Sequence, residues 1–125
     1  MGTAARSLTE RVILLVEDED AVRHVVARML VEAGFPVVEA RSGDEAVAQI
    51  HLLQGKLHLV VSDLAMPGMS GSALAATIAE RWPNLPVLLI SGALTGDEPA
   101  RFLRKPFTPE ALIEAVERLL PTPKH

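Results

Sequence analysis

The strongest constraint on the fold comes from residues 57–71, which read LHLVVSDLAMPGMSG. The first six of these residues are mostly aliphatic and β-branched, as in a strand that is buried on both faces of a parallel sheet. Asp63 follows directly, and Pro67, Gly68 and Gly71 then break the strand pattern. The sequence therefore predicts a carboxylate at the carboxyl edge of a parallel sheet, which is the edge where open α/β folds bind ligands.

Four further short apolar segments have the character of buried strands. They are residues 11–16, 36–40, 86–90 and 101–104. Apolar residues recur at helical spacing in four other segments, which are residues 21–33, 42–53, 71–82 and 109–120. Strands and helices alternate along the chain, except for a loop before the last strand. This alternation predicts an α/β fold with a five-stranded parallel sheet, right-handed crossovers and helices on both faces.

Local signals predict where the helices end and which face they bury. Asp20 is the expected N-cap of the first helix, Gly34 is expected to end it, and Thr108 is expected to cap the last helix. The predicted buried face of the first helix consists of Val22, Val25, Val26, Met29 and Leu30. In the second helix it consists of Ala46, Val47, Ile50 and Leu53, and in the third it includes Leu74 and Ile78.

Length, charge and cysteine content limit the possible functions. The 125 residues are enough for one domain, which we expect over residues 11–120, with a disordered lead or linker at 1–10 and a tail at 121–125. No apolar run approaches the ~20 residues of a membrane span, and residues 1–10 lack the apolar core of a signal peptide, so we expect a cytoplasmic protein without membrane insertion. A net charge of −4 argues against direct nucleic-acid binding, and the lack of cysteine excludes thiolate sites.

Polar residues follow the predicted strands and are expected to meet at one edge of the sheet. Glu17 and Asp18 follow the first strand, Asp63 the third, Ser91 the fourth and Lys105 the last. Clustered carboxylates repel one another unless a cation neutralises them, which predicts a divalent metal. Oxygen ligands without cysteine favour Mg²⁺ or Mn²⁺ over Zn²⁺. Lys105 and Ser91 are then suited to contact the oxygens of a phosphoryl group on Asp63.

Four of these features together give the chain a resemblance to the receiver domains of two-component response regulators, over about residues 11–120. They are the pair Glu17-Asp18 after an apolar strand, the run VVSDLAMPGMSG, the step Ser91-Gly92 and the run RKPF around Lys105. The resemblance implies a flavodoxin-like, doubly wound sheet. It also implies that Asp63 takes a phosphoryl group from a phosphohistidine, on a histidine kinase or a histidine phosphotransfer domain.

The resemblance implies roles for the other residues as well. The direct Mg²⁺ ligands would be Asp18, Asp63 and the backbone carbonyl of Ala65. Glu17 would act through a metal-bound water. Ser91 and Lys105 would contact the phosphoryl group, and Ser91 and Phe102 would form the switch that changes the partner surface. Such a protein is a signalling phosphoacceptor and not a turnover enzyme, because it catalyses only its own phosphorylation and slow dephosphorylation.

The chain departs from that family between Ser91 and Lys105, which are 14 positions apart. Receiver domains usually have a longer segment there, so the sequence predicts that a loop, ALTGDEPA, replaces the fourth helix. In the family, that helix forms part of the surface by which phosphorylated receivers dimerise or contact effectors. We therefore expect an ordinary phosphorylation site joined to an unusual output face.

Two alternatives remain open on the sequence alone. A pseudo-receiver would keep the fold as a phosphorylation-independent interaction module, and the short segment after Ser91 leaves room for that hypothesis. A phosphatase of the haloacid dehalogenase type would share a nucleophilic aspartate, a lysine and Mg²⁺. Those enzymes, however, carry a D-x-D motif after the first strand, where this chain has Glu17-Asp18-Glu19. The sequence fits a stand-alone regulator as well as one part of a larger protein, such as a hybrid histidine kinase.

Overall fold

The computed structural model describes residues 11–53, 55–92 and 101–120. Its strands are β1 (Val12–Val16), β2 (Val37–Ala40), β3 (Leu57–Asp63), β4 (Val87–Ser91) and β5 (Phe102–Arg104). They pair in parallel in the order β2-β1-β3-β4-β5. This is the strand order of flavodoxin-like, doubly wound sheets, so the predicted fold class is confirmed.

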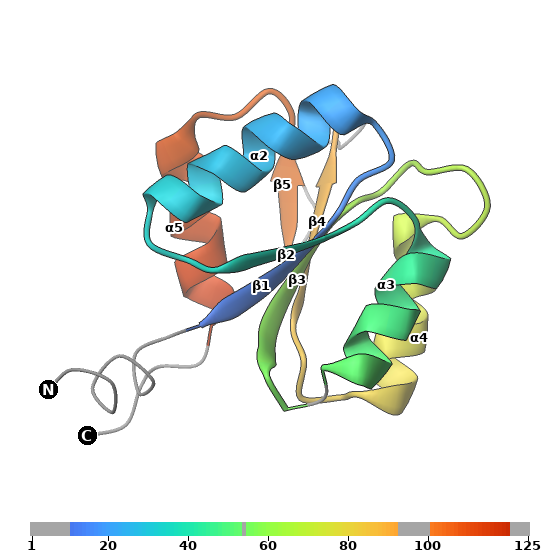
Figure 1. Ribbon diagram of the computed structural model, residues 1–125. Coiled ribbons are helices and arrows are strands. Elements are labelled where there is room, and N and C mark those ends of the chain that lie inside the picture. The colour runs from blue at the N-terminus through green and yellow to red at the C-terminus, as the bar shows by residue number, and fades with distance from the viewer. Residues whose placement is uncertain (1–10, 54, 93–100, 121–125) are drawn as a thin grey trace, which may run out of the picture.

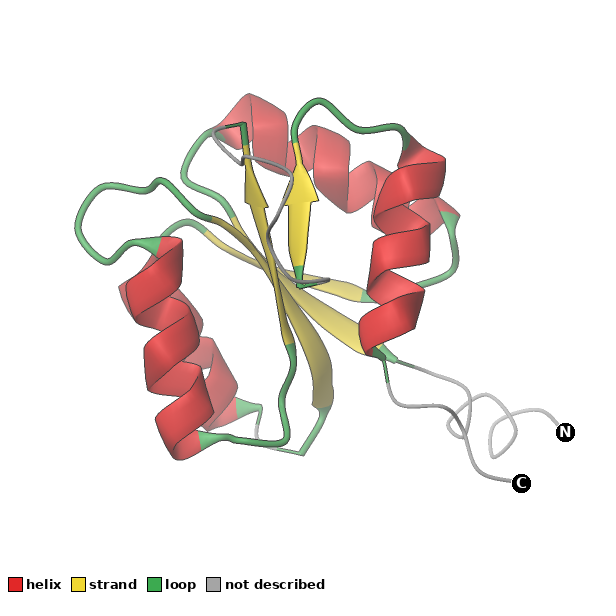
Figure 2. Ribbon diagram, turned by 180° about the vertical axis from the view of Figure 1, so that it is seen from behind, coloured by secondary structure: helices red, strands yellow, loops and turns green. Residues whose placement is uncertain are grey.

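The helices cover both faces of the sheet. They are α2 (Asp20–Glu32), α3 (Gly43–Leu52), α4 (Gly71–Arg81) and α5 (Pro109–Leu119). Figure 1 shows α2 and α5 on one face and α3 and α4 on the other, and Figure 2 shows the same layers from behind. Within the described ranges, no helix is long and apolar enough to cross a membrane.

The sheet separates two hydrophobic clusters. On the α2 and α5 side, Ile13 and Leu15 of β1 pack with residues such as Leu30 and Leu112. On the α3 and α4 side, the intervening Leu14 and Val16 pack with residues that include Ala46, Ile50, Leu74 and Ile78. Alternate residues of a strand point to opposite faces, so a sheet covered on both sides needs apolar residues at every position. This explains the unbroken apolar runs in the sequence.

The predicted face of the first helix is partly wrong. Val25 was expected to be buried, but it is 55% exposed. Arg23, only two residues earlier, is 5% exposed and lies among the buried residues of α2. The helix is therefore rotated relative to the purely apolar prediction, because the guanidinium of Arg23 finds hydrogen-bond acceptors on neighbouring elements. Helical spacing alone does not reveal such acceptors.

The predicted N-cap of that helix is also wrong. Glu19 is the N-cap residue and makes no side-chain capping bond, whereas Asp20 is the first helical residue. The Asp20 carboxylate instead accepts a hydrogen bond from Arg23, one turn further on. The capping prediction for the last helix is confirmed, since the Thr108 hydroxyl accepts a hydrogen bond from the backbone N–H of Ala111. The serines Ser42 and Ser70 cap α3 and α4 in the same way.

The predicted loop in place of a fourth helix, residues 93–100, lies outside the described residues. The predicted lead at 1–10 and tail at 121–125 lie outside them too. The described elements show that β4 ends at Ser91 and that β5 begins at Phe102.

Candidate functional site

Strand register brings the predicted site residues to one edge of the sheet. Val16 of β1 pairs with Ser62 of β3, so Glu17 and Asp63, the next residues, lie side by side. On the other side of β3, the backbone N–H of Lys105 donates to the carbonyl of Ser91, at the end of β4. The predicted convergence at the carboxyl edge is thus confirmed for β1, β3, β4 and β5.

Three carboxylates meet at this edge. Each of Glu17, Asp18 and Asp63 offers a carboxylate oxygen, and these oxygens lie within 4.8 Å of one another. Glu17 is only 4% exposed, and the side chain of Asp63 is 11% exposed. Burial raises the pKa of Glu17 to about 6, and the charge of Asp63 contributes to the rise, while the Glu19 backbone N–H and Lys105 oppose it. The side chain of Asp18 is exposed, so the site combines two largely buried carboxylates with a third that opens to water.

Lys105 supplies the positive charge that faces these acids. Its Nζ lies 3.0 Å from Oδ1 of Asp63 and 3.9 Å from Oε1 of Glu17. One ammonium group offsets only part of the charge of three carboxylates. A donor set made of oxygens, with excess negative charge, fits a hard divalent cation such as Mg²⁺ or Mn²⁺.

Gly68, Gly71 and Met69 shape the loop after β3. The backbone N–H of Gly71, the first residue of α4, donates to the carbonyl of Leu64 over 2.8 Å. A Cβ at Gly71 would collide with the carbonyl oxygen of Asp63 and with Cα of Leu64. Gly68 has a φ of +74°, and the Met69 side chain occupies the space where Gly43 would otherwise carry a Cβ. The sequence prediction treated Gly71 only as a chain breaker and missed this close approach to Asp63.

The remaining predicted site residues are Ser91, Ala65 and Phe102. Ser91 is buried and ends β4, the strand next to Asp63. Ala65 is an exposed residue two positions after Asp63. Phe102 begins β5 and lines a groove with residues of α4, including Ala75 and Ala76, so it does not belong to the carboxylate cluster. Their roles in the site stay predictions.

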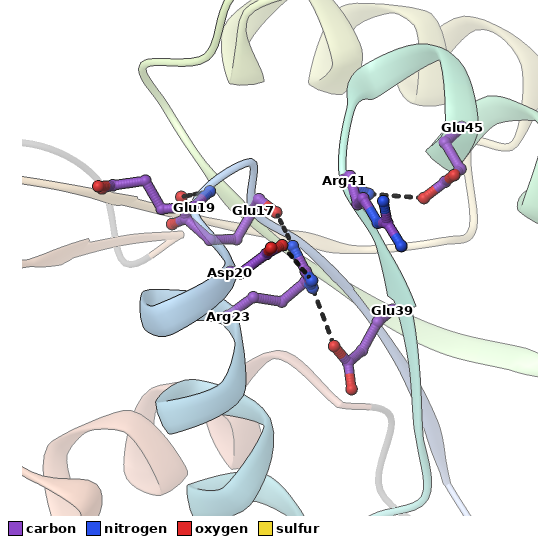
Figure 3. A network of polar contacts seen from close by, with 7 residues as sticks. All are labelled: Glu17, Glu19, Asp20, Arg23, Glu39, Arg41 and Glu45. Atoms are coloured by element: carbon purple, nitrogen blue, oxygen red, sulfur yellow. Dashed lines mark hydrogen bonds and ion pairs between the residues drawn. The ribbon is translucent and has the colours of Figure 1, made fainter.

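The sequence prediction missed Arg23. Its guanidinium donates to the backbone carbonyl of Glu17 and to the carboxylates of Asp20 and Glu39 (Figure 3). The hydrogen bond from Arg23 lowers the pKa of the Asp20 carboxyl. The available signal was an arginine that interrupts an apolar helical face three residues after an aspartate, which is a spacing that allows an ion pair.

Comparison with known proteins identifies the family. The sequence profile of the response regulator receiver domain matches residues 13–117. The chain belongs to the response regulator receiver domain family. This assignment confirms the resemblance carried by the strand-end residues. It also removes the haloacid-dehalogenase-type phosphatase as an explanation of the site.

The receiver domain has relatives that are short and relatives that are long. It is 32% identical over 118 residues to the chemotaxis protein CheY of Pseudomonas aeruginosa, covering 86% of this chain and 94% of CheY. It is 38% identical over 116 residues to the sensor kinase CckA of Brucella abortus, covering 86% of this chain and 12% of CckA. The chain thus spans only a small part of that relative, and about a quarter of the response regulator FleR of P. aeruginosa.

Solved structures resemble this receiver domain along most of its length. The receiver domain of the hybrid histidine kinase CckA is 41% identical with a TM-score of 0.76, covering 88% of this chain and 99% of that one. The response regulator TrrA of Thermotoga maritima, solved in complex with Mg²⁺-BeF, is 28% identical with a TM-score of 0.78 and the same coverage of both chains. The receiver fold is therefore shared across distant relatives.

Proposed function

We propose that this receiver domain accepts a phosphoryl group on Asp63 from the phosphohistidine of a histidine kinase or histidine phosphotransfer domain, with Mg²⁺ or Mn²⁺ bound at the carboxylates. The observation that carries the proposal is the contact of Lys105 with Asp63 inside the cluster of three carboxylates. All the charged groups that the reaction needs are present, which favours a phosphoacceptor over a pseudo-receiver.

Asp63 is the nucleophile of the proposed reaction. One of its carboxylate oxygens attacks phosphorus, the P–N bond to the donor imidazole breaks, and the imidazole nitrogen keeps the bonding pair and takes up a proton. Lys105, now 3.0 Å from Oδ1 of Asp63, donates hydrogen bonds to a phosphoryl oxygen during transfer. The Ser91 hydroxyl donates to another phosphoryl oxygen. The protein contributes position and charge, and phosphoryl transfer requires little covalent chemistry beyond the nucleophile.

The metal ligands of the proposal are Asp18, Asp63 and the backbone carbonyl of Ala65, with Glu17 acting through a water. A bound Mg²⁺ would neutralise charge on the transferring phosphoryl group. Glu17 is suited to the indirect role because a backbone N–H already occupies one of its oxygens. That donor is the N–H of Glu19, 3.1 Å from Oε2 of Glu17.

An apolar groove beside the site suits the surface of a protein phosphodonor. The groove has a volume of about 430 Å³ and reaches from Asp63 and Lys105 across α2 to the loop after β5. Its apolar lining includes Val22, Val25, Met29 and Phe107. Docking of a protein donor here would remove these apolar side chains from water. Because Asp63 lies in the same groove, a partner docked there would bring its phosphohistidine to the nucleophile.

Ser91 and Phe102 form the proposed switch. Ser91 lies on β4, between the strand of Asp63 and β5, and Leu89 of β4 pairs with Phe102. Movement of the Ser91 hydroxyl toward a phosphoryl group would therefore shift β4, the strand that pairs with Phe102 of β5. Phe102 has no hydroxyl, so its part in the switch is a change of packing next to α4.

Phosphorylation by a small-molecule donor tests the proposal. The wild-type protein is incubated with acetyl phosphate and Mg²⁺ and is compared with Asp63→Asn by intact mass. We expect a mass increase of one phosphoryl group that requires Mg²⁺ and is absent in Asp63→Asn. Asp44→Asn, which removes an exposed carboxylate at the start of α3, is the matched control and should still be modified. A folded wild-type protein that takes up no phosphoryl group would support the pseudo-receiver instead.

A further inference from the structure

Arg23 is a buried cation that the proposed chemistry does not use. Its side chain is 6% exposed, although it lies on a helix that covers one face of the sheet. Nε donates to Oε1 of Glu39 over 2.9 Å, and Nη2 donates to Oδ1 of Asp20 over 2.6 Å. The third contact differs in kind, because Nη1 donates to the backbone carbonyl of Glu17 over 3.0 Å. Figure 3 shows how these partners surround the guanidinium.

Burying a guanidinium costs desolvation free energy, so the position of Arg23 requires an explanation. A buried ion pair commonly adds little to stability compared with apolar side chains of the same volume. Val26 and Leu30, on the same side of α2, fill their places with purely apolar groups. The feature that an apolar residue could not reproduce is the hydrogen bond to the Glu17 carbonyl.

The Glu17 carbonyl belongs to the peptide that joins Glu17 to Asp18. The side chains of both residues belong to the carboxylate cluster. The orientation of the peptide plane therefore affects the direction of both carboxylates. The N–H of Glu17 is held by the carbonyl of Ala40, and its carboxylate is held by the N–H of Glu19. The bond from Arg23 fixes the carbonyl, which none of these contacts reaches.

We propose that Arg23 is a positioning residue for the divalent metal, which fixes the Glu17–Asp18 peptide so that both carboxylates face Asp63. Glu39 of β2 holds the guanidinium from the other side and so extends the support to a neighbouring strand. This inference rests on the proposed function, because it concerns the metal at that site. Groups that orient metal ligands without touching the metal commonly change metal affinity by about 10–100-fold when they are removed.

The sign of the effect separates three possible roles. A purely structural role for Arg23 leaves Mg²⁺ affinity unchanged, even where overall stability falls. A through-space effect of its charge opposes cation binding, so removing the charge would tighten binding. Only positioning predicts that loss of the arginine weakens binding.

Calorimetric titration with Mg²⁺ alone tests the inference on the whole chain. We expect Arg23→Met, which keeps the stem but no donor, to raise the Mg²⁺ dissociation constant about tenfold. Arg23→Lys keeps the charge but cannot serve three acceptors with the same geometry, so a smaller loss is expected. Glu39→Gln should also weaken binding, by less than Arg23→Met.

Arg28→Met is the matched control. Arg28 lies on the same helix, its side chain is 80% exposed, and its ion pair is with Glu32. Its removal should leave Mg²⁺ affinity unchanged. A second measurement is the increase of the melting temperature caused by Mg²⁺, which should be smaller in Arg23→Met than in the wild type, whatever the two metal-free values are.

Unchanged or tighter Mg²⁺ binding by Arg23→Met would overturn the inference. If that variant does not fold, unchanged affinity in both Arg23→Lys and Glu39→Gln would overturn it equally. These results would leave the proposed function intact, because the wild type would still bind the metal. A wild-type protein that does not bind Mg²⁺ would instead contradict the proposed function, and the inference with it.

Discussion

Gly71 lies where the first turn of α4 approaches the backbone of Asp63. A Cβ at this position would collide with the carbonyl oxygen of Asp63 and with Cα of Leu64. Both obstacles are backbone atoms, which cannot turn aside as a side chain can. We expect Gly71→Ala to lower the free energy of unfolding by about 1–3 kcal/mol, the usual cost of overpacking, and to slow phosphorylation by acetyl phosphate. Urea unfolding and intact mass measure the two effects.

Ser72→Ala is the control for this substitution. Ser72 is the next residue of α4 and is exposed, so the change should alter the free energy of unfolding by less than about 0.5 kcal/mol. Equal stability of Gly71→Ala and Ser72→Ala would show that the helix can move away from Asp63 without cost.

Glu17 makes the free energy of unfolding of the metal-free protein depend on pH. Burial raises its pKa from 4.5 to about 6, so the folded protein binds a proton there more readily than the unfolded chain does. The cost of the buried charge is fully present above pH 6 and is relieved as the pH falls from 6 to 4.5. We expect Glu17→Gln to be more stable than the wild type above pH 6 and to lose this advantage toward pH 4.5.

The measurement is urea unfolding of both proteins in EDTA across this pH range. Chelation matters because a bound cation would remove the penalty that the wild type carries. A difference in unfolding free energy that stays constant with pH would show that Glu17 has the same pKa in the folded and unfolded states, so that burial does not raise it.

At the level of elements, α2 presents two exposed valines in different settings. Val25 lines the groove that contains Asp63 and Lys105, and Val31 does not, although both are about half exposed. We expect Val25→Lys to slow phosphotransfer from a phosphorylated histidine kinase that is active on the wild type, by tenfold or more. A lysine at this position would have to give up its hydration against an apolar partner, and a tenfold loss corresponds to about 1.4 kcal/mol. Phosphorylation by acetyl phosphate should be unchanged, because the small donor needs no docking surface.

Val31→Lys is the matched control, with the same charge on the same helix. Its transfer rate from the kinase should equal that of the wild type. Equal slowing by both substitutions would mean that the kinase responds to the charge of α2 in general and not to the groove.

The same helix shows what local patterns can and cannot predict. The positions of α2, α3, α4 and α5 agree with the sequence prediction to within a few residues, because apolar spacing, Gly34 and the cap Thr108 act locally. The orientation of α2 was predicted less well. Arg23 is buried because its guanidinium donates to Asp20 in the first turn of α2, to the Glu17 carbonyl after β1 and to Glu39 on β2. Val25, which has no polar group to bind them, is exposed instead.

For the whole molecule, the carboxylate cluster links metal binding to stability. A ligand that binds only the folded state stabilises it by ~2.7 kcal/mol when its concentration is 100 times its dissociation constant. For a domain of this size, that corresponds to an increase of the melting temperature of about 10 °C. We expect Mg²⁺ to produce such an increase and EDTA to reverse it, as measured by thermal unfolding.

Asp18→Asn removes one carboxylate of the cluster and should abolish most of this increase. Glu32→Gln, at an exposed carboxylate on α2, should retain it. An increase of the same size in Asp18→Asn would mean that Mg²⁺ stabilises the fold from another site.

The sequence by itself determined the elements, the parallel sheet and the acidic edge. Those features depend on apolar runs and on the residue that follows each run, and parallel strands bring their carboxyl ends together whatever else the chain contains. The sequence also contained the family motif that predicts Asp63 as the phosphoacceptor. Only the tertiary structure decided that Gly71 touches the backbone of Asp63 and that Arg23 holds the corner before Asp18. Such contacts join segments through backbone atoms. Every residue has a backbone carbonyl, so the residue types do not show which carbonyl will be contacted.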